Sequence, residues 1–159
     1  MNMRDVGMNE SHSLKCEMAA EVLRSSGTLR LRVTGWSMLP TVWPGDMLIV
    51  ERVESAEVME GDIVLFVRHR RLIAHRVVKN HSSTMVTRGD SMEAADSPVS
   101  ENEFLGRVSS IVRNERNIEP RKALGAGERA IASLVQHSDV AARVVVGLRG
   151  LLQISTQTV

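Results

Sequence analysis

Ser37 is the residue of this chain whose surroundings best suit nucleophilic chemistry. It lies between Gly35 and Pro40, just after an apolar–polar alternating run over residues 29–33. A glycine permits an unusual backbone and a proline stops a helix from continuing, so a serine here can expose its hydroxyl at a strand end. The backbone N–H groups of Ser37 and Met38 would then be free to hold an oxyanion. The alternative is a serine that only stabilises a local turn.

A serine hydroxyl is a weak nucleophile until a base takes its proton, and His75 is the candidate base. It lies within a second strand-like run, over residues 72–78. An imidazole exchanges protons near neutral pH without the desolvation that a lysine base requires. The alternative is a strand histidine that packs in the core or accepts one hydrogen bond. The other histidines lie in polar or helical surroundings and are assigned no role. They are His12, His69, His81 and His137.

Two carboxylates are candidates for the third member of a Ser-His-Asp triad. Asp90 follows Arg88-Gly89, and Asp96 lies six residues further along the chain. Either could orient the imidazole and stabilise its protonated form. An aspartate in a turn also commonly binds nearby backbone N–H groups, which suits Asp90. The residue types alone leave the choice open.

Strand-like runs must position these side chains. Short apolar or β-branched runs alternate with turn-forming sequences such as Pro44-Gly45-Asp46. This pattern is typical of a mainly β fold, and we expect a compact, bent, mostly antiparallel β-domain over residues 28–112. The six predicted strands cover residues 29–33, 47–50, 63–67, 72–78, 84–87 and 105–112.

Helices are expected on both sides of the β-domain. The N-terminal unit, residues 1–27, is predicted to hold a flexible tail over 1–13 and a helix over 14–25. Apolar residues recur there at helical spacing, and Gly27 is the expected stop.

The C-terminal unit, residues 113–159, is predicted to begin with a polar connector over 113–127. Two helices follow it, over 128–137 and 139–153. We expect the apolar face of the last helix to pack on the β-domain. The alternative is weak docking of that face on a membrane or a partner.

The composition is that of an ordinary soluble domain. The chain has 159 residues, 43% hydrophobic and 25% charged, and its net charge of +1 gives no argument for a nucleic-acid partner. The single Cys16 cannot form an internal disulfide, and no His or Cys pair has metal-ligand spacing, so we predict neither metal nor cofactor. Without a secretory leader or a membrane-spanning run, a cytoplasmic location is expected, or a peripheral membrane one if the last helix docks.

Motifs in a fixed order between about residue 30 and residue 112 resemble the type I signal peptidase family and its relatives, the self-cleaving SOS-type repressors. They are Ser37-Met38-Leu39-Pro40-Thr41 with Pro44-Gly45-Asp46, Gly61-Asp62-Ile63-Val64-Leu65-Phe66, His75-Arg76-Val77-Val78, Thr87-Arg88-Gly89-Asp90 and Gly106-Arg107-Val108. The bacterial branch of that family has a lysine base. This chain has a histidine in the equivalent strand, so the resemblance is to the Ser-His branch, without the membrane anchor of a signal peptidase.

The resemblance implies a role for each matched residue. Ser37 would be the nucleophile and His75 the base. Asp96 matches the triad position of the Ser-His branch, whereas Asp90 matches the member that stabilises a turn. The substrate cleft is expected around three residues in or directly before the first motif. They are Trp36, Met38 and Pro40.

The function that the resemblance implies is that of a serine endopeptidase of the signal-peptidase type. It would cut a peptide or protein precursor next to a small residue, as in signal peptide processing. The alternative is a self-cleaving regulator, or a catalytically inactive binding module, on the same β fold. Only residues 1–27 precede the β-domain, too few for an ordinary DNA-binding domain, so no nucleic-acid partner is expected.

Overall fold

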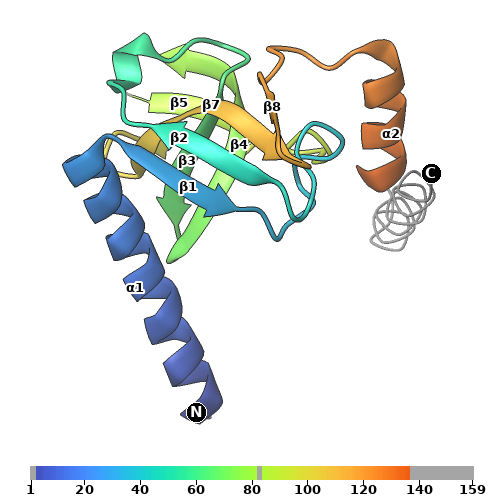
Figure 1. Ribbon diagram of the computed structural model, residues 1–159. Coiled ribbons are helices and arrows are strands. Elements are labelled where there is room, and N and C mark those ends of the chain that lie inside the picture. The colour runs from blue at the N-terminus through green and yellow to red at the C-terminus, as the bar shows by residue number, and fades with distance from the viewer. Residues whose placement is uncertain (1–2, 82–83, 137–159) are drawn as a thin grey trace.

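An antiparallel sheet of eight strands forms most of the computed structural model, which describes residues 3–81 and 84–136 (Figure 1). One helix precedes the strands in the chain, and another follows them. The predicted mainly β, antiparallel fold is therefore confirmed. The strands are β1 (Thr28–Arg32), β2 (Met47–Glu51), β3 (Ile63–Arg68), β4 (Arg71–His81), β5 (Thr84–Arg88), β6 (Val99–Ser100), β7 (Phe104–Arg113) and β8 (Arg116–Ile118).

The spatial order of the strands is β1-β2-β7-β3-β4-β5-β6, with β8 paired to β7. The pairing register shifts at three places, between β2 and β7, between β3 and β7, and between β4 and β5. Such bulges bend a strand and increase its twist. The strands of the sheet contribute to two apolar clusters. The first cluster is centred on Leu48, Val50 and Leu65, and the second on Val64 and Phe66.

Strand β8 corrects the expectation of an irregular connector over 113–127. Asn114 and Glu115 take the left-handed backbone conformation, with φ of 49° and 63°. Two consecutive residues of this kind form a tight hairpin turn, so the chain returns along β7 instead of leaving the sheet. A polar composition concealed this short strand.

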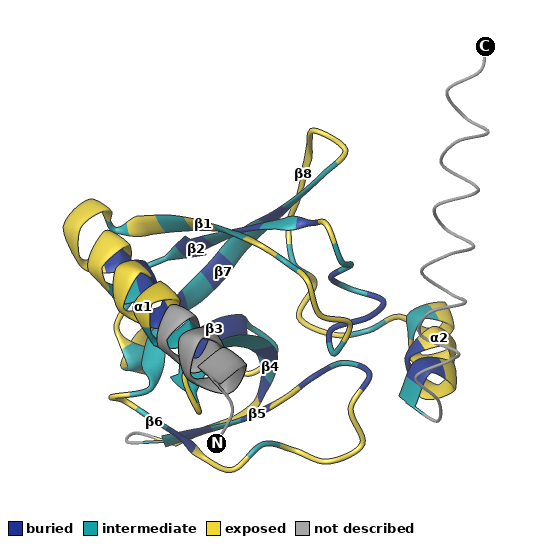
Figure 2. Ribbon diagram, turned by 90° about the horizontal axis from the view of Figure 1, so that it is seen from below, coloured by how far each residue is buried: buried dark blue, intermediate teal, exposed yellow. Residues whose placement is uncertain are grey.

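Helix α1 (Met3–Ser26) begins eleven residues before its predicted start, so the expectation of a flexible tail over 1–13 is wrong for residues 3–13. No proline interrupts this stretch, and a helix that is anchored at one end gains a backbone hydrogen bond with each added residue. The anchor is the buried face of Cys16, Ala19 and Leu23 (Figure 2). The helix ends at Gly27, whose φ is +73°, as the sequence predicts.

Helix α2 (Ala126–Gln136) corresponds to the first predicted C-terminal helix. Its Val135 packs with Leu39 and Trp43, next to the turn that carries Ser37. The second predicted helix, over 139–153, lies outside the described residues, and so does its expected packing or docking. None of the helices in the described ranges is both long and apolar enough to cross a membrane.

Candidate active site

Ser37 lies in a turn that follows β1, as the pattern of its motif predicts. The amide of Leu39 donates to the carbonyl of Trp36 at 3.0 Å, and the amide of Val42 donates to the carbonyl of Met38 at 2.9 Å. These bonds coil the chain just after Ser37, because Gly35 and Pro40 discourage both a continued strand and a long helix.

A buried ion pair holds the far end of this turn. The guanidinium of Arg113, on β7, binds the Asp46 carboxylate and donates to the carbonyl of Thr41 at 2.8 Å. The same carboxylate accepts the amide of Trp43 at 2.8 Å. Asp46 is only 4% exposed, so a largely buried, charge-assisted contact fixes the turn to the sheet.

His75, on β4, lies within hydrogen-bond distance of Ser37. The distance from Ser37 Oγ to His75 Nε2 is 3.0 Å, and that from His75 Nδ1 to Asp96 Oδ2 is 2.7 Å. An ionised carboxylate can only accept, so Nδ1 carries the ring proton and Nε2 is left to accept the Ser37 hydroxyl. The ring is buried, and Phe66 meets it edge-on at 6.1 Å between centroids.

Asp96 is held in its ionised form. Burial alone would raise the pKa of this carboxyl, but hydrogen bonds from His75 and Thr87 outweigh it and lower the pKa. The Thr87 hydroxyl donates to Asp96 Oδ2 at 2.7 Å, and the Asp96 amide donates to the Thr87 carbonyl at 2.8 Å. Because Thr87 belongs to β5, the neighbour of β4, sheet pairing brings Asp96 to the imidazole.

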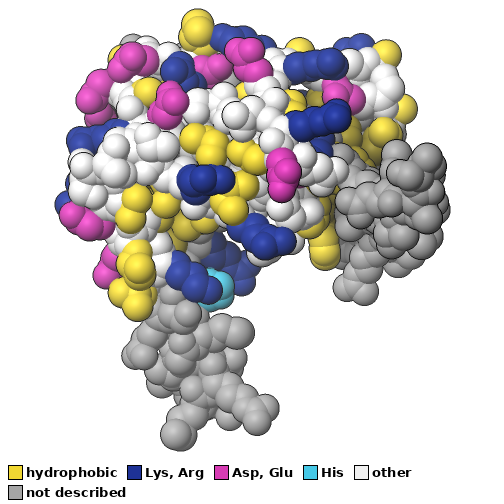
Figure 3. All heavy atoms as spheres, in the orientation of Figure 1, with side chains coloured by type: hydrophobic (Ala, Val, Ile, Leu, Met, Phe, Trp, Pro, Cys, Tyr) yellow, Lys and Arg dark blue, Asp and Glu magenta, His cyan; other side chains and the backbone are white. Residues whose placement is uncertain are grey.

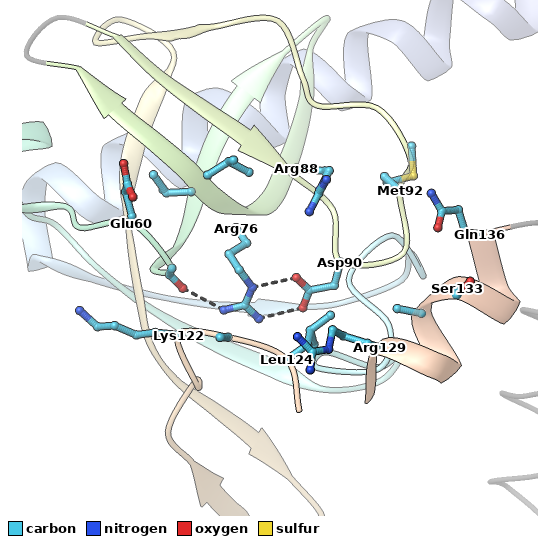
Figure 4. A pocket seen from close by; sticks show the side chains of 15 residues that line it. Glu60, Arg76, Arg88, Asp90, Met92, Lys122, Leu124, Arg129, Ser133 and Gln136 are labelled. Carbon is cyan, nitrogen blue, oxygen red and sulfur yellow. Dashed lines mark hydrogen bonds and ion pairs between the residues drawn. The ribbon is translucent and has the colours of Figure 1, made fainter. Parts of the chain in front are cut away.

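Asp90 is directed to a different partner. Its two carboxylate oxygens accept Nε and Nη2 of Arg76, each at 2.8 Å, and it also binds the Thr41 hydroxyl (Figure 4). Arg76 further donates to the carbonyls of Gly61 and Arg121. Asp90 therefore joins β4 to the Ser37 turn, Arg76 extends this link to the segment before α2, and Asp90 makes no hydrogen bond to His75.

The Asp90–Arg76 pair borders a pocket of about 550 Å³ beside α2, whose lining includes neither Ser37 nor His75. Figure 4 shows Arg129, Ser133 and Gln136 of α2 at one side of this pocket.

Gly89 allows the loop that carries Asp90 to approach the serine and the imidazole. A Cβ built on Gly89 would lie 2.6 Å from the Ser37 carbonyl oxygen and 3.2 Å from His75 Nε2. The amide of Ser91 donates to that same carbonyl at 3.0 Å. A side chain at residue 89 would thus displace the two groups that the site aligns.

Arg68, on β3, clamps the chain just after Asp96. It donates to the carbonyls of Ser97 and Pro98, at 2.8 Å and 2.9 Å, while binding both carboxylate oxygens of Glu103. The hydrogen bond from Arg68 is the main reason that the pKa of Glu103 falls from 4.5 to about 2. This ion pair fixes the loop from which Asp96 reaches His75.

Replacing Glu103 with glutamine will therefore make the protein less stable at neutral pH and less sensitive to acid. Because folding depresses the pKa of Glu103, its stabilisation is present above pH 4.5 and is lost as the pH falls toward about 2. Urea unfolding across this pH window will show a shallower decline for Glu103→Gln than for the wild type. Glu101→Gln removes an exposed carboxylate nearby and should keep the wild-type slope; equal slopes for all three proteins would contradict the role given to Glu103.

A groove of about 600 Å³ opens beside Ser37 and His75. Its lining includes Leu31, Met38 and Ala74, so Met38, one of the three residues expected in the cleft, borders this groove. The backbone N–H groups of Ser37 and Met38 make no hydrogen bond within residues 3–81 and 84–136, and both adjoin the Ser37 hydroxyl.

The other two residues expected in the cleft are not part of the groove lining. Trp36 is 38% exposed, and its carbonyl accepts the Ser91 hydroxyl. Pro40 is buried, and its carbonyl accepts the indole N–H of Trp43. The turn after Ser37 thus buries Pro40 outside the groove, which is lined mainly by residues of α1, β1 and β4 and by Met38.

Sequence reasoning gave no role to several side chains that position the site. They are Thr41, Arg68, Arg76, Thr87, Ser91 and Arg113. The only signal for Thr87 and Arg76 was their place in the ordered motifs. Arg68 and Arg113 act across long stretches of sequence, and no local pattern indicates them.

The chain also matches a known protein family. The family described as Peptidase S24-like matches residues 5–109, more than half of the chain. This range includes Ser37, His75 and both aspartates. No curated protein matches the chain.

Proposed function

Because the chain belongs to the Peptidase S24-like family, and because Ser37, His75 and Asp96 form one hydrogen-bonded series, we propose that it is a serine endopeptidase. Its substrate would be a peptide or protein precursor. The observation that carries the proposal is the 3.0 Å contact from Ser37 Oγ to a ring nitrogen of His75 that is free to accept a proton. This is the contact that nucleophilic catalysis by serine requires.

Each residue has a distinct part in the proposed reaction. His75 Nε2 takes the Ser37 proton as Oγ attacks the peptide carbonyl, and the ring later gives that proton to the leaving amine. Asp96 keeps the ring in the required tautomer and stabilises its protonated form. The N–H groups of Ser37 and Met38 hold the oxygen of the tetrahedral intermediate, which bears the negative charge. Water then releases the acyl group from Ser37.

The groove fits an extended peptide. Strand β1 is an edge strand, and its end together with the segment after it, residues 31–35, lines the groove opposite residues 70–75, which lead into β4 and form its start. Exposed strand edges commonly bind a peptide as an additional strand. The apolar floor beside Ser37 favours small, uncharged side chains next to the scissile bond, which agrees with cleavage of the signal-peptidase type.

A second candidate function is cleavage of the chain by itself, as in the self-cleaving repressors of this superfamily. The family match favours it as much as it favours cleavage of a separate substrate. The two differ in kinetic order. Mass spectrometry of the purified chain, alone and with a peptide library, will show new termini that depend on Ser37. A cleavage rate per molecule that is independent of protein concentration indicates self-cleavage, whereas cut library peptides indicate a separate substrate.

Replacing each aspartate with asparagine will distinguish their roles, because one variant should lose activity and the other should lose stability. Asp96→Asn should lower kcat by on the order of 10²-fold to 10⁴-fold with little loss of stability, because the ring loses the carboxylate that sets its tautomer. Asp90→Asn should instead lower the free energy of unfolding by about 3 kcal/mol, because it leaves the guanidinium of Arg76 without its charged partner. The measurements are steady-state kinetics and urea unfolding. A folded Asp90→Asn protein as inactive as Asp96→Asn would reverse the assignment.

A further inference from the structure

Positive charge gathers on the groove that contains Ser37 and His75. Four basic side chains line it, Lys15 from α1, Arg32 from the end of β1, and Arg70 and Arg71 from the hairpin that leads into β4. No carboxylate belongs to the described groove lining. Figure 3 shows Lys and Arg side chains gathered around a His side chain at the lower edge of this face, beside α1.

These cations are not neutralised by the rest of the described chain. Ion pairs engage other arginines, among them Arg68, Arg76 and Arg113, whereas no ion pair within residues 12–81 and 84–136 involves the four groove cations. All four are exposed to solvent. The whole chain has a net charge of only +1, so the accumulation is local.

The strand geometry gives the distance from these charges to the reacting bond. Arg71 precedes His75 by four residues on β4, so both side chains lie on the same side of the strand. At about 3.3 Å per residue, they are separated by roughly 13 Å along it. An extended peptide has the same rise, so a substrate side chain about four residues from the scissile bond would reach Arg71.

We infer that the groove selects peptides that carry acidic side chains about four residues from the cleaved bond. This inference rests on the proposed peptidase function and deepens it. Glutamate or aspartate there would bind Arg70 and Arg71, while a small side chain would occupy the apolar floor beside Ser37. The contacts are at the surface, so they steer and select the substrate more than they tighten its binding.

A peptide fits these observations better than the other polyanions do. The four basic side chains border a groove that also contains Ser37. A membrane surface is unlike a peptide in this respect, because it is flat and could not enter the groove. No Trp or Phe side chain belongs to the described lining, so the groove lacks the stacking surface on which single-stranded nucleic acids are usually bound.

Binding to the Ser37→Ala protein tests the inference separately from catalysis. Two labelled peptides with a small residue at their centre are compared by fluorescence anisotropy, one with Glu on both flanks and one with Gln at the same positions. The Glu peptide should bind about threefold to tenfold more tightly at low salt, and the preference should vanish at high salt. When Arg70→Gln and Arg71→Gln are added to the Ser37→Ala protein, its affinity for the Glu peptide should fall to its affinity for the Gln peptide.

A matched double variant, Arg30→Gln with Arg116→Gln, removes two exposed charges outside the groove and should keep the preference. Equal affinities for the two peptides would overturn the inference, and so would an equal loss in the matched variant. Tighter binding of a single-stranded oligonucleotide or an anionic vesicle than of the Glu peptide would overturn it too. If the wild type cuts neither peptide but the preference depends on Arg70 and Arg71, the proposed function fails while the groove's selectivity stands.

Discussion

Replacing Ser37 with alanine will lower the rate of peptide cleavage by on the order of 10³-fold or more, while the protein stays folded. Without Oγ no acyl intermediate can form, and only binding and the two oxyanion N–H groups remain to assist water. The Ser37 side chain donates one hydrogen bond, to His75, and is not part of the apolar clusters. The thermal unfolding midpoint should therefore stay close to the wild-type value.

The measurement is the appearance of new peptide termini over time, followed by mass spectrometry at equal concentrations of folded protein. Ser97→Ala is the matched control, because Ser97 is exposed and binds Arg68 only through its carbonyl. We expect this control to cleave at the wild-type rate. Equal cleavage by the wild type and by Ser37→Ala would show that the activity does not belong to this site.

Replacing His75 with glutamine will cost about as much activity as the loss of Ser37, again on the order of 10³-fold. Glutamine keeps part of the buried volume and can still hydrogen-bond to Asp96, but its amide cannot take a proton at neutral pH. The nucleophile would then remain protonated while the turn around it stays in place. Single-turnover kinetics on the same peptide measure the loss in the chemical step.

The double variant provides the sharpest check on this prediction. If Ser37 and His75 act as one unit, Ser37→Ala with His75→Gln should be no slower than either single variant. Losses that multiply would show that the two residues contribute independently. His81→Gln, at the exposed end of the same strand, is the control for replacing a histidine of β4.

The strands that carry the site were predictable from the sequence because their signals are local. Alternating apolar residues mark β1, and short β-branched runs mark the strands from β2 onward. The order of the motifs, through the family resemblance that it carries, was enough to predict that Ser37 and His75 belong to the same site. Strands β6 and β8 were not predicted, because β6 is only two residues long and β8 is three residues long with a single apolar residue, Ile118.

The face of α1 that packs on the sheet could not be read from its periodicity. Apolar residues occur at helical spacing on two sides of the helix, and either set could have been buried. The structure buries Cys16, Ala19 and Leu23, and leaves Leu14 and Met18 more than half exposed. The small side chains of Cys16 and Ala19 allow the closer approach.

What the sequence by itself determined is the chemistry available to this protein: a serine in a sharp turn, a histidine on a strand, and two aspartates in the loop that follows β5. Which of the two aspartates lies against His75 was decided only by the tertiary structure. Arg76, next to His75 on β4, points to the opposite side of the strand and binds Asp90 there. Thr87, on the paired strand, holds Asp96 against the imidazole. Residues six apart in one loop thus reach opposite sides of β4, and no local pattern carries that information, because strand pairing over long sequence distances sets it.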